Sequence, residues 1–205
     1  SICLNERVIR VQKNQVISEH ASYQADLVVS SVDAEVFSRL LNPKAVIKDR
    51  ERSCSGVAIY AVLNEPLPAH TVTHSVIMPD KPDSLYKALK QNIPPSQTMM
   101  FVNYYKPNEI YPNTKPTVAL LLTAPADGER YDLSSPWVIT ELERASKLLG
   151  LPQSIIELIE DSVTLNPDYF QQYGAPNGAL YGATRQLWRS GPFHSPAHHN
   201  PLRPW

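Results

Sequence analysis

The first forty residues alternate apolar and polar positions in the way that short β-strands do. Apolar residues alternate or cluster in three segments: 2–4, 7–11 and 16–18. A polar turn at 13–15 separates the last two, so the pattern predicts a small β-meander. The continuous apolar run 25–30 is short enough for a strand buried on both faces. Asp33 is placed to cap a helix over 34–41, and a strand followed by a helix is typical of an α/β sheet edge.

The middle of the chain has the pattern of an antiparallel sheet with helices on it. Four segments rich in Val, Ile, Tyr and Leu are separated by proline-bearing loops: 55–63, 74–78, 98–105 and 117–123. Helices are predicted over 83–90 and 135–149, and a further helix begins at Pro152. Strands and helices segregated in this way favour an α+β fold, with helices packed on a mostly antiparallel sheet.

The two later helices are predicted to be amphipathic. The buried stripe of the longer one consists of Val138, Leu142, Ala145 and Leu149. Its charged residues fall largely on the other side: Glu141, Glu143, Arg144 and Lys147. The helix from Pro152 directs four apolar residues inward: Ile155, Ile156, Leu158 and Ile159. Glu157, Glu160 and Asp161 then form a polar helix face, from which no general acid and base can be chosen.

Proline usage divides the chain. Of its 19 prolines, Pro43 alone precedes residue 66, so we expect three parts: a strand-rich segment 1–42, a central domain 43–165 and a return segment 166–205. The last segment has no regular period, and the chain starts at Ser1 in a strand-like pattern. We therefore expect it to be part of a longer polypeptide.

Composition and charge exclude several classes of protein. The 205 residues are 42% hydrophobic and 19% charged, as in a folded globular protein rather than a disordered one. A net charge of -1 offers no basic surplus for a nucleic acid, so no such partner is expected. No eighteen consecutive residues are apolar, and we expect no signal peptide. Cys3 and Cys54 suit a reducing compartment, so we expect a cytoplasmic protein.

Candidate reactive residues are few. His70 and His74 have a zinc-like spacing, as do His194, His198 and His199, but neither group has further ligands nearby, so no metal site is expected. Cys54 precedes an apolar strand and is predicted to be inert. No catalytic side chain is predicted. The glycines at 174, 178 and 182 follow no strand and contain no G-x-G, so they form no phosphate cradle. Several aromatic residues are suited to line an apolar cavity, although ordinary core packing explains most of them equally well: Tyr60, Tyr104, Tyr105, Tyr169, Phe170, Tyr173, Tyr181, Trp188 and Trp205.

Three segments together resemble the carotenoid (phytoene) desaturase family of FAD-dependent, amine oxidase-like flavoproteins. They are the strand pair with its A-D-x-V-V-x-x-x-D run (8–33), the strand Ser53–Tyr60, and the stretch Tyr173–Gly182 that continues through 190–193. Their order and spacing agree with the family, and the third is the most specific. The family's two glycine-rich FAD-binding motifs are missing, in agreement with only 7 glycines.

The resemblance implies a role for each of the three parts of the chain. Residues 1–42 would be part of an FAD-binding domain, 43–165 the substrate-binding domain, and 166–205 the return toward the FAD domain. Val8 would approach the adenine through its backbone, and Gly174, Pro176 and Gly178 would border the flavin ring. Val8 is equally well explained as a core valine, and the glycines as ordinary turn glycines. FAD is expected in the parent protein and not on this chain, which alone would be inactive.

The leading hypothesis is thus an oxidoreductase of carotenoid biosynthesis, a phytoene dehydrogenase, that desaturates a carotenoid or related isoprenoid chain. Its partners would be an apolar polyene, the rest of the FAD-binding domain and, peripherally, the membrane from which the polyene is collected. A saturase or isomerase acting on polyenes is a related possibility. The alternative from another class is a non-catalytic lipid-binding or interaction module, which would be colourless where a flavoprotein is yellow.

Overall fold

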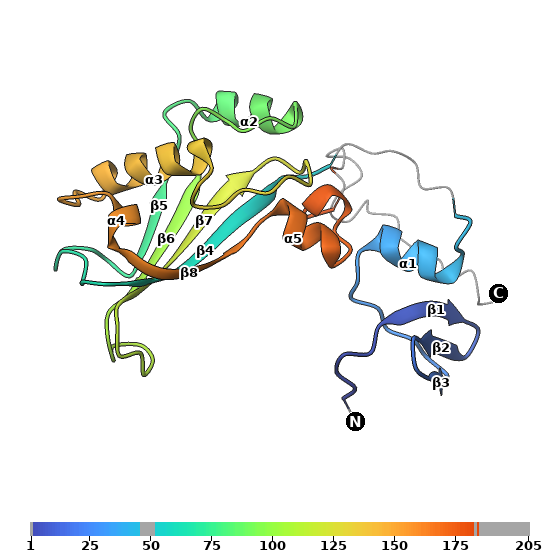
Figure 1. Cartoon of the computed structure of the whole chain (residues 1–205). Coiled ribbons are helices and arrows are strands. Elements are labelled where there is room, and N and C mark those ends of the chain that lie inside the picture. The colour runs from blue at the N-terminus through green and yellow to red at the C-terminus, as the bar shows by residue number, and fades with distance from the viewer. Residues whose placement is uncertain (1, 46–51, 183, 185–205) are drawn as a thin grey trace, which may run out of the picture. The chain divides into compact units, whose positions relative to one another are not determined.

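The computed structural model describes residues 2–45, 52–182 and 184 (Figure 1). Their contacts divide them into two compact units. The N-terminal unit comprises residues 2–45 with 182 and 184, and the sheet unit comprises 52–181. The sheet unit thus continues beyond residue 165, where the central domain was expected to end.

The N-terminal unit contains the predicted meander and helix. Its antiparallel strands are β1 (Val8–Gln12), β2 (Gln15–Ser18) and β3 (Ser22–Gln24), in that order. Asn14 takes a positive φ of 58° in the turn between β1 and β2, as asparagine readily does. Helix α1 (Ala34–Leu41) contacts β1. As predicted, the Asp33 carboxylate caps α1 by accepting a hydrogen bond of 2.8 Å from the Glu35 N–H.

Two strand predictions in this unit are wrong. Residues 2–4 and 25–30 form no strand, and Leu27 and Val29 are 70% and 85% exposed. The sheet ends at β3, so none of the strands that the structure describes pairs with 25–30. An apolar run of this length needs a sheet on both sides to be buried, and the N-terminal unit described here does not supply one.

The sheet unit is built on five antiparallel strands in the order β5-β6-β7-β4-β8 (Figure 1). Their bounds are β4 (Ser55–Leu63), β5 (His74–Ile77), β6 (Met100–Tyr105), β7 (Thr117–Ala124) and β8 (Ile159–Leu165). The four predicted strands are confirmed, and so is the mixed α+β class. Strand β8 was missed. The helix expected from Pro152 is the single turn α4 (Ile155–Leu158), after which the backbone of Ile159 becomes extended. Glu160 and Asp161 therefore lie on a strand, not on a helix face.

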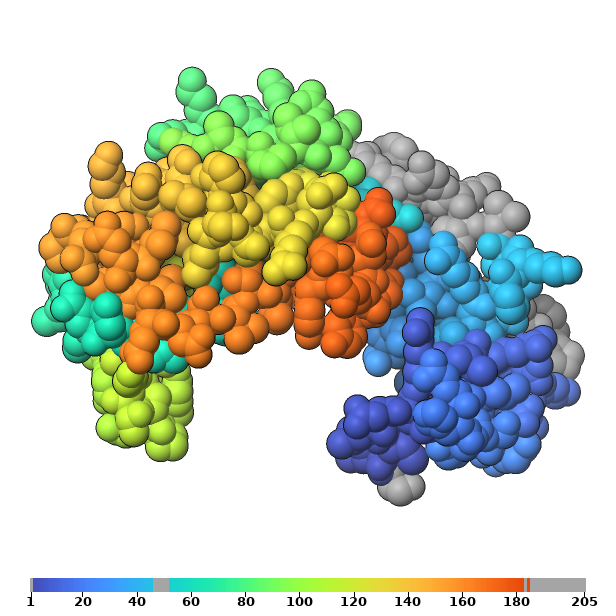
Figure 2. All heavy atoms as spheres, in the orientation of Figure 1, coloured from blue at the N-terminus to red at the C-terminus, as the bar shows by residue number. Residues whose placement is uncertain are grey.

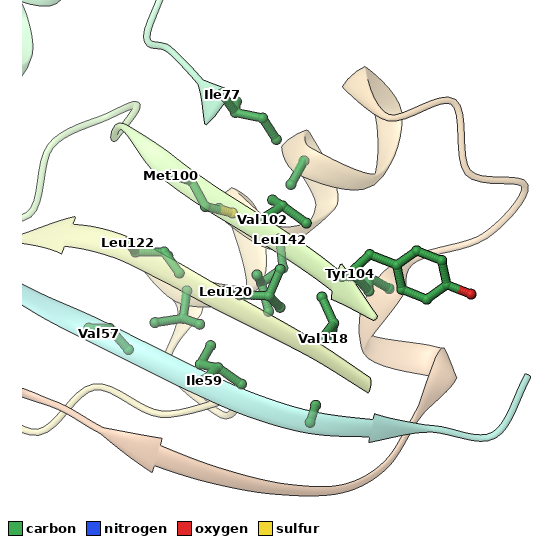
Figure 3. Close-up of a cluster of buried hydrophobic side chains, with 14 of the residues drawn as sticks. Val57, Ile59, Ile77, Met100, Val102, Tyr104, Val118, Leu120, Leu122 and Leu142 are labelled. Carbon is green, nitrogen blue, oxygen red and sulfur yellow. The ribbon is translucent and has the colours of Figure 1, made fainter. Parts of the chain in front are cut away.

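One face of this sheet packs against helices α3 (Pro136–Leu148) and α4 to form the core (Figures 1 and 3). Alternate residues of β4, β6 and β7 point into it, among them Val57, Ile59, Val102, Tyr104, Leu120 and Leu122. From α3 come Val138, Leu142 and Ala145, as predicted. The expectation that Glu141 lies on the polar side is wrong, because its side chain is completely buried. Burial is tolerated since Arg144 pairs with it, with Nη2 2.6 Å from Oε2.

The remaining helices lie outside this core. Helix α2 (Pro82–Lys90) lies between β5 and β6 in the chain. After β8, where no regular period was expected, the chain forms α5 (Pro167–Gln172) and the 3₁₀ turn η1 (Pro176–Gly178). Among the described residues, no helix has the length and apolar character needed to cross a membrane.

Candidate functional site: an apolar sheet face

The face of the five-stranded sheet opposite α3 and α4, here called the open face, is apolar along one of its rows of residues. Antiparallel partners point to the same side, so the register arranges its residues in rows across the strands. One row, the apolar row, runs from β5 to β8 through Val76, Phe101, Leu121, Ala58 and Leu165. The next, the mixed row, contains His74, Asn103, Ala119, Tyr60 and Val163. Val76, Phe101, Tyr60 and Val163 are 54%, 41%, 49% and 61% exposed.

The open face changes in polarity along the strands. Beyond the apolar row lie Gly56 and Thr123, which are paired, and Met99, whose carbonyl accepts from Thr123 N–H. Beyond the mixed row lies a polar row with Tyr105, Thr117, Val62 and Asp161. The apolar row and the row of Gly56, Thr123 and Met99 beyond it therefore carry no titratable side chain, whereas the opposite end is polar. Apolar surface of this kind contributes to binding only through contact area, at about 25 cal/mol per Å² removed from water.

The segment 178–181 closes the apolar end of the open face. Its backbone runs beside the start of β4: Leu180 N–H donates to the Cys54 carbonyl at 3.1 Å, and Ser55 Oγ donates to the Gly178 carbonyl at 2.6 Å. A methyl group at Gly56 would lie 3.3 Å from Leu180 Cδ1, so the Leu180 side chain covers that glycine. These contacts join two of the three segments that resemble the desaturase family.

The structure gives Gly178, one of the predicted flavin-bordering residues, a packing role. Gly178 has a φ of 77°, and a Cβ there would overlap the backbone of Pro167, including its carbonyl oxygen. Gly174 also has a positive φ, of 94°, and Pro176 begins η1. These three residues share one segment of the sheet unit. Val8, the predicted adenine contact, is 36% exposed on β1 and belongs to the N-terminal unit.

The other candidate reactive residues have local partners. Burial raises the pKa of the Cys54 thiol, so its thiolate is scarce near neutral pH, consistent with an inert thiol. His74 Nδ1 lies 2.8 Å from Asn103 Oδ1, and His70 Nε2 lies 3.4 Å from the Leu149 carbonyl. Within 2–45, 52–182 and 184, no three His, Cys, Asp or Glu side chains are grouped to hold a metal. His194, His198 and His199, and likewise Trp188 and Trp205, lie outside the described residues.

Sequence reasoning identified four of the five strands but missed β8 and the open face. The sequence did contain a sign of this face, because β4 and β7 carry apolar residues at both odd and even positions and therefore on both faces of the sheet. In β4, for example, Ala58, Tyr60 and Val62 alternate with Val57 and Ile59. A strand with one solvated face normally alternates apolar and polar residues. Comparisons with protein-family models and with curated proteins found no match for this chain.

Proposed function

We propose that the sheet unit is the substrate-binding part of an FAD-dependent oxidoreductase that desaturates a carotenoid or related isoprenoid chain. The observation that carries the proposal is the open face, on which β5, β6, β4 and β8 expose the large side chains of Val76, Phe101, Tyr60 and Val163. The supporting resemblance is the ordered set of three desaturase-like segments, two of which meet at the end of this face.

The dimensions of the open face suit an extended hydrocarbon. Successive rows are two residues apart, or about 7 Å, so the four rows span about 20 Å along the strands. Five strands at about 4.8 Å spacing give a similar width. A polyene makes almost no hydrogen bonds, so its affinity must come from buried apolar area. The open face would hold such a chain, orient it and exclude water from one of its sides.

FAD would supply the redox chemistry, by accepting a hydride from a saturated carbon–carbon bond while a proton leaves. Gly178 is accounted for by its packing on Pro167, and Val8 lies in the other unit. We therefore derive no step at the flavin from this chain, and we infer that FAD is held mainly by polypeptide outside these residues.

The decisive experiment expresses the complete genomic reading frame that contains this chain and incubates it with phytoene. The proposal predicts a yellow, flavin-containing protein that converts phytoene to products absorbing at longer wavelength. Phe101→Glu and Val163→Glu place a charge on the open face, so each should lower turnover at least about tenfold, the equivalent of 1.4 kcal/mol, with flavin content unchanged.

The matched control is Tyr86→Glu, which introduces the same charge at an exposed aromatic residue of α2. It should leave turnover unchanged. A colourless protein that binds phytoene without converting it would instead establish the non-catalytic lipid-binding alternative. A yellow protein whose turnover is unaffected by charges on the open face would refute the placement of the substrate.

A further inference from the structure

Strand β8 forms a free edge of the five-stranded sheet. Of the strands that the structure describes, only β4 pairs with β8, which is the last strand in the order β5-β6-β7-β4-β8 (Figure 1). Figure 2 shows the orange atoms of this part of the chain at the surface of the sheet unit. An edge of this kind presents backbone N–H and C=O groups with which another strand can pair.

The hydrogen bonds between β4 and β8 determine which backbone groups of β8 point away from the sheet. Asn64 N–H, just after β4, donates to the Leu158 carbonyl, just before β8, at 2.9 Å. Because successive residues of a strand direct their backbone groups to opposite sides, the even-numbered residues of β4 face β8. Their partners are the odd-numbered residues 161, 163 and 165. The N–H and C=O groups of Ser162 and Thr164 therefore point outward, away from β4.

The Asp161 side chain occupies one of these outward N–H groups. Its Oδ1 accepts a hydrogen bond of 2.8 Å from the Ser162 N–H, although Asp161 is itself exposed and pairs with Val62 of β4. Glu160, which is skipped in the register between the two strands, is bound by Lys115, with Nζ 2.6 Å from Oε1. A satisfied N–H gains little by pairing with another strand, and charged side chains and bulges are typical of protected edges. Asp161 therefore covers this edge.

The outer side of β8 is complementary to a second copy of itself. The residues 161–165 are centred on Val163, so a two-fold axis that pairs them antiparallel places the two Val163 residues opposite each other. Val163 is 61% exposed, so this pair would bury apolar surface. In the same register Ser162 lies opposite Thr164 of the second copy, and Asp161 lies opposite Leu165. Like charges are thus not directly opposed.

We propose that the free edge of β8 is a self-pairing surface for a second copy of this chain, and that the Asp161 side chain blocks it. The backbone hydrogen bonds between the two strands would come from Ser162 and Thr164 of each copy. Half of them need the Ser162 N–H that Asp161 occupies. The edge therefore pairs when this N–H is released. The inference is independent of the proposed function, because no ligand of the open face enters it.

Two neutral replacements of Asp161 separate the hydrogen bond from the charge. Asp161→Asn removes the charge but keeps an oxygen that can accept from the Ser162 N–H, whereas Asp161→Ala removes the acceptor as well. Sedimentation equilibrium of the full chain measures the dissociation constant of self-association for the wild type and both variants. Asp161→Ala should associate at least about tenfold more tightly than the wild type, as the released hydrogen bonds imply. Asp161→Asn should associate as the wild type does.

Proline substitutions test whether β8 is the surface used. Ser162→Pro and Thr164→Pro each remove an outward N–H and leave the bonds to β4 in place, so adding either to Asp161→Ala should abolish the tighter association. Circular dichroism and the urea midpoint verify that these variants fold. An Asp161→Ala variant that associates no more tightly than Asp161→Asn would overturn the proposal. So would an association that survives both prolines and is lost in Phe101→Glu, because the contact would then lie on the open face.

Discussion

Replacing Arg144 by methionine tests whether the buried ion pair on α3 holds the sheet unit together. The Glu141 side chain is 0% exposed and that of Arg144 is 16% exposed. Thr98 N–H donates to Glu141 Oε2 at 2.9 Å, and Arg144 donates to the Thr98 and Met78 carbonyls at 2.5 and 3.2 Å. The pair therefore ties α3 to both ends of the segment that carries α2 between β5 and β6.

Arg144→Met leaves a buried carboxylate whose remaining partner in these contacts is one backbone N–H. Breaking a buried ion pair in this way costs about 3–5 kcal/mol. Replacing Glu141 by methionine as well removes the unpaired charge, so the double variant loses only hydrogen bonds, about 1–3 kcal/mol. The double variant should therefore be more stable than Arg144→Met alone.

Urea denaturation of the three proteins, followed by circular dichroism, measures these free energies of unfolding. Arg130→Met is the control, because its partner Asp132 is 3.6 Å away and the Arg130 side chain is 75% exposed. Such a surface pair contributes about 0–1 kcal/mol. A loss below about 1 kcal/mol for Arg144→Met, or a double variant less stable than the single one, would refute this role of the pair.

Three further predictions concern single residues. Gly178→Ala should lower the free energy of unfolding by more than about 1–2 kcal/mol, the cost of a left-handed non-glycine residue, because its Cβ also overlaps a backbone carbonyl; an unchanged urea midpoint would contradict this. Iodoacetamide at pH 8 should alkylate exposed Cys3 well before Cys54, whose pKa is raised by burial; mass spectrometry reads the order, and equal rates would argue against a shielded Cys54. Hydrogen bonds from Ser134 lower the pKa of Asp132, so its carboxylate stabilises the fold above its unfolded pKa of about 4. The stability advantage over Asp132→Asn should decline as pH falls from that value through the lower folded pKa, and an advantage that does not decline on acidification would exclude this linkage.

The sheet could be predicted because its strands carry local signals. Segments rich in β-branched and aromatic residues are separated by prolines, which makes the strand bounds readable without knowledge of the partners. Asp33 and Pro136 likewise mark helix starts by local chemistry. Strand β8 could not be predicted from local sequence signals of this kind. The apolar residues that lead into it, from Ile155 to Ile159, have helical spacing, and the strand forms by pairing with β4.

The burial of Glu141 and the open face depend on contacts between distant segments. From sequence alone, a glutamate on an amphipathic helix is predicted to face the solvent. The partner that receives the buried Glu141 carboxylate, the Thr98 N–H, lies 43 residues away in the chain. The rows of the open face exist only once the register of five strands is fixed. The apolar run 25–30 shows the opposite error, since its composition predicts burial that the described N-terminal unit does not provide.

Photoaffinity labelling tests the central claim most directly. A geranylgeraniol analogue with a diazirine on its hydrocarbon chain is bound to the full chain and photolysed, and the adducts are mapped by mass spectrometry. The account predicts adducts on open-face residues such as Phe101, Tyr60 and Val163, with competition by unlabelled geranylgeraniol. Adducts that spread over α2, including exposed Tyr86, or that resist competition would contradict a ligand-binding open face.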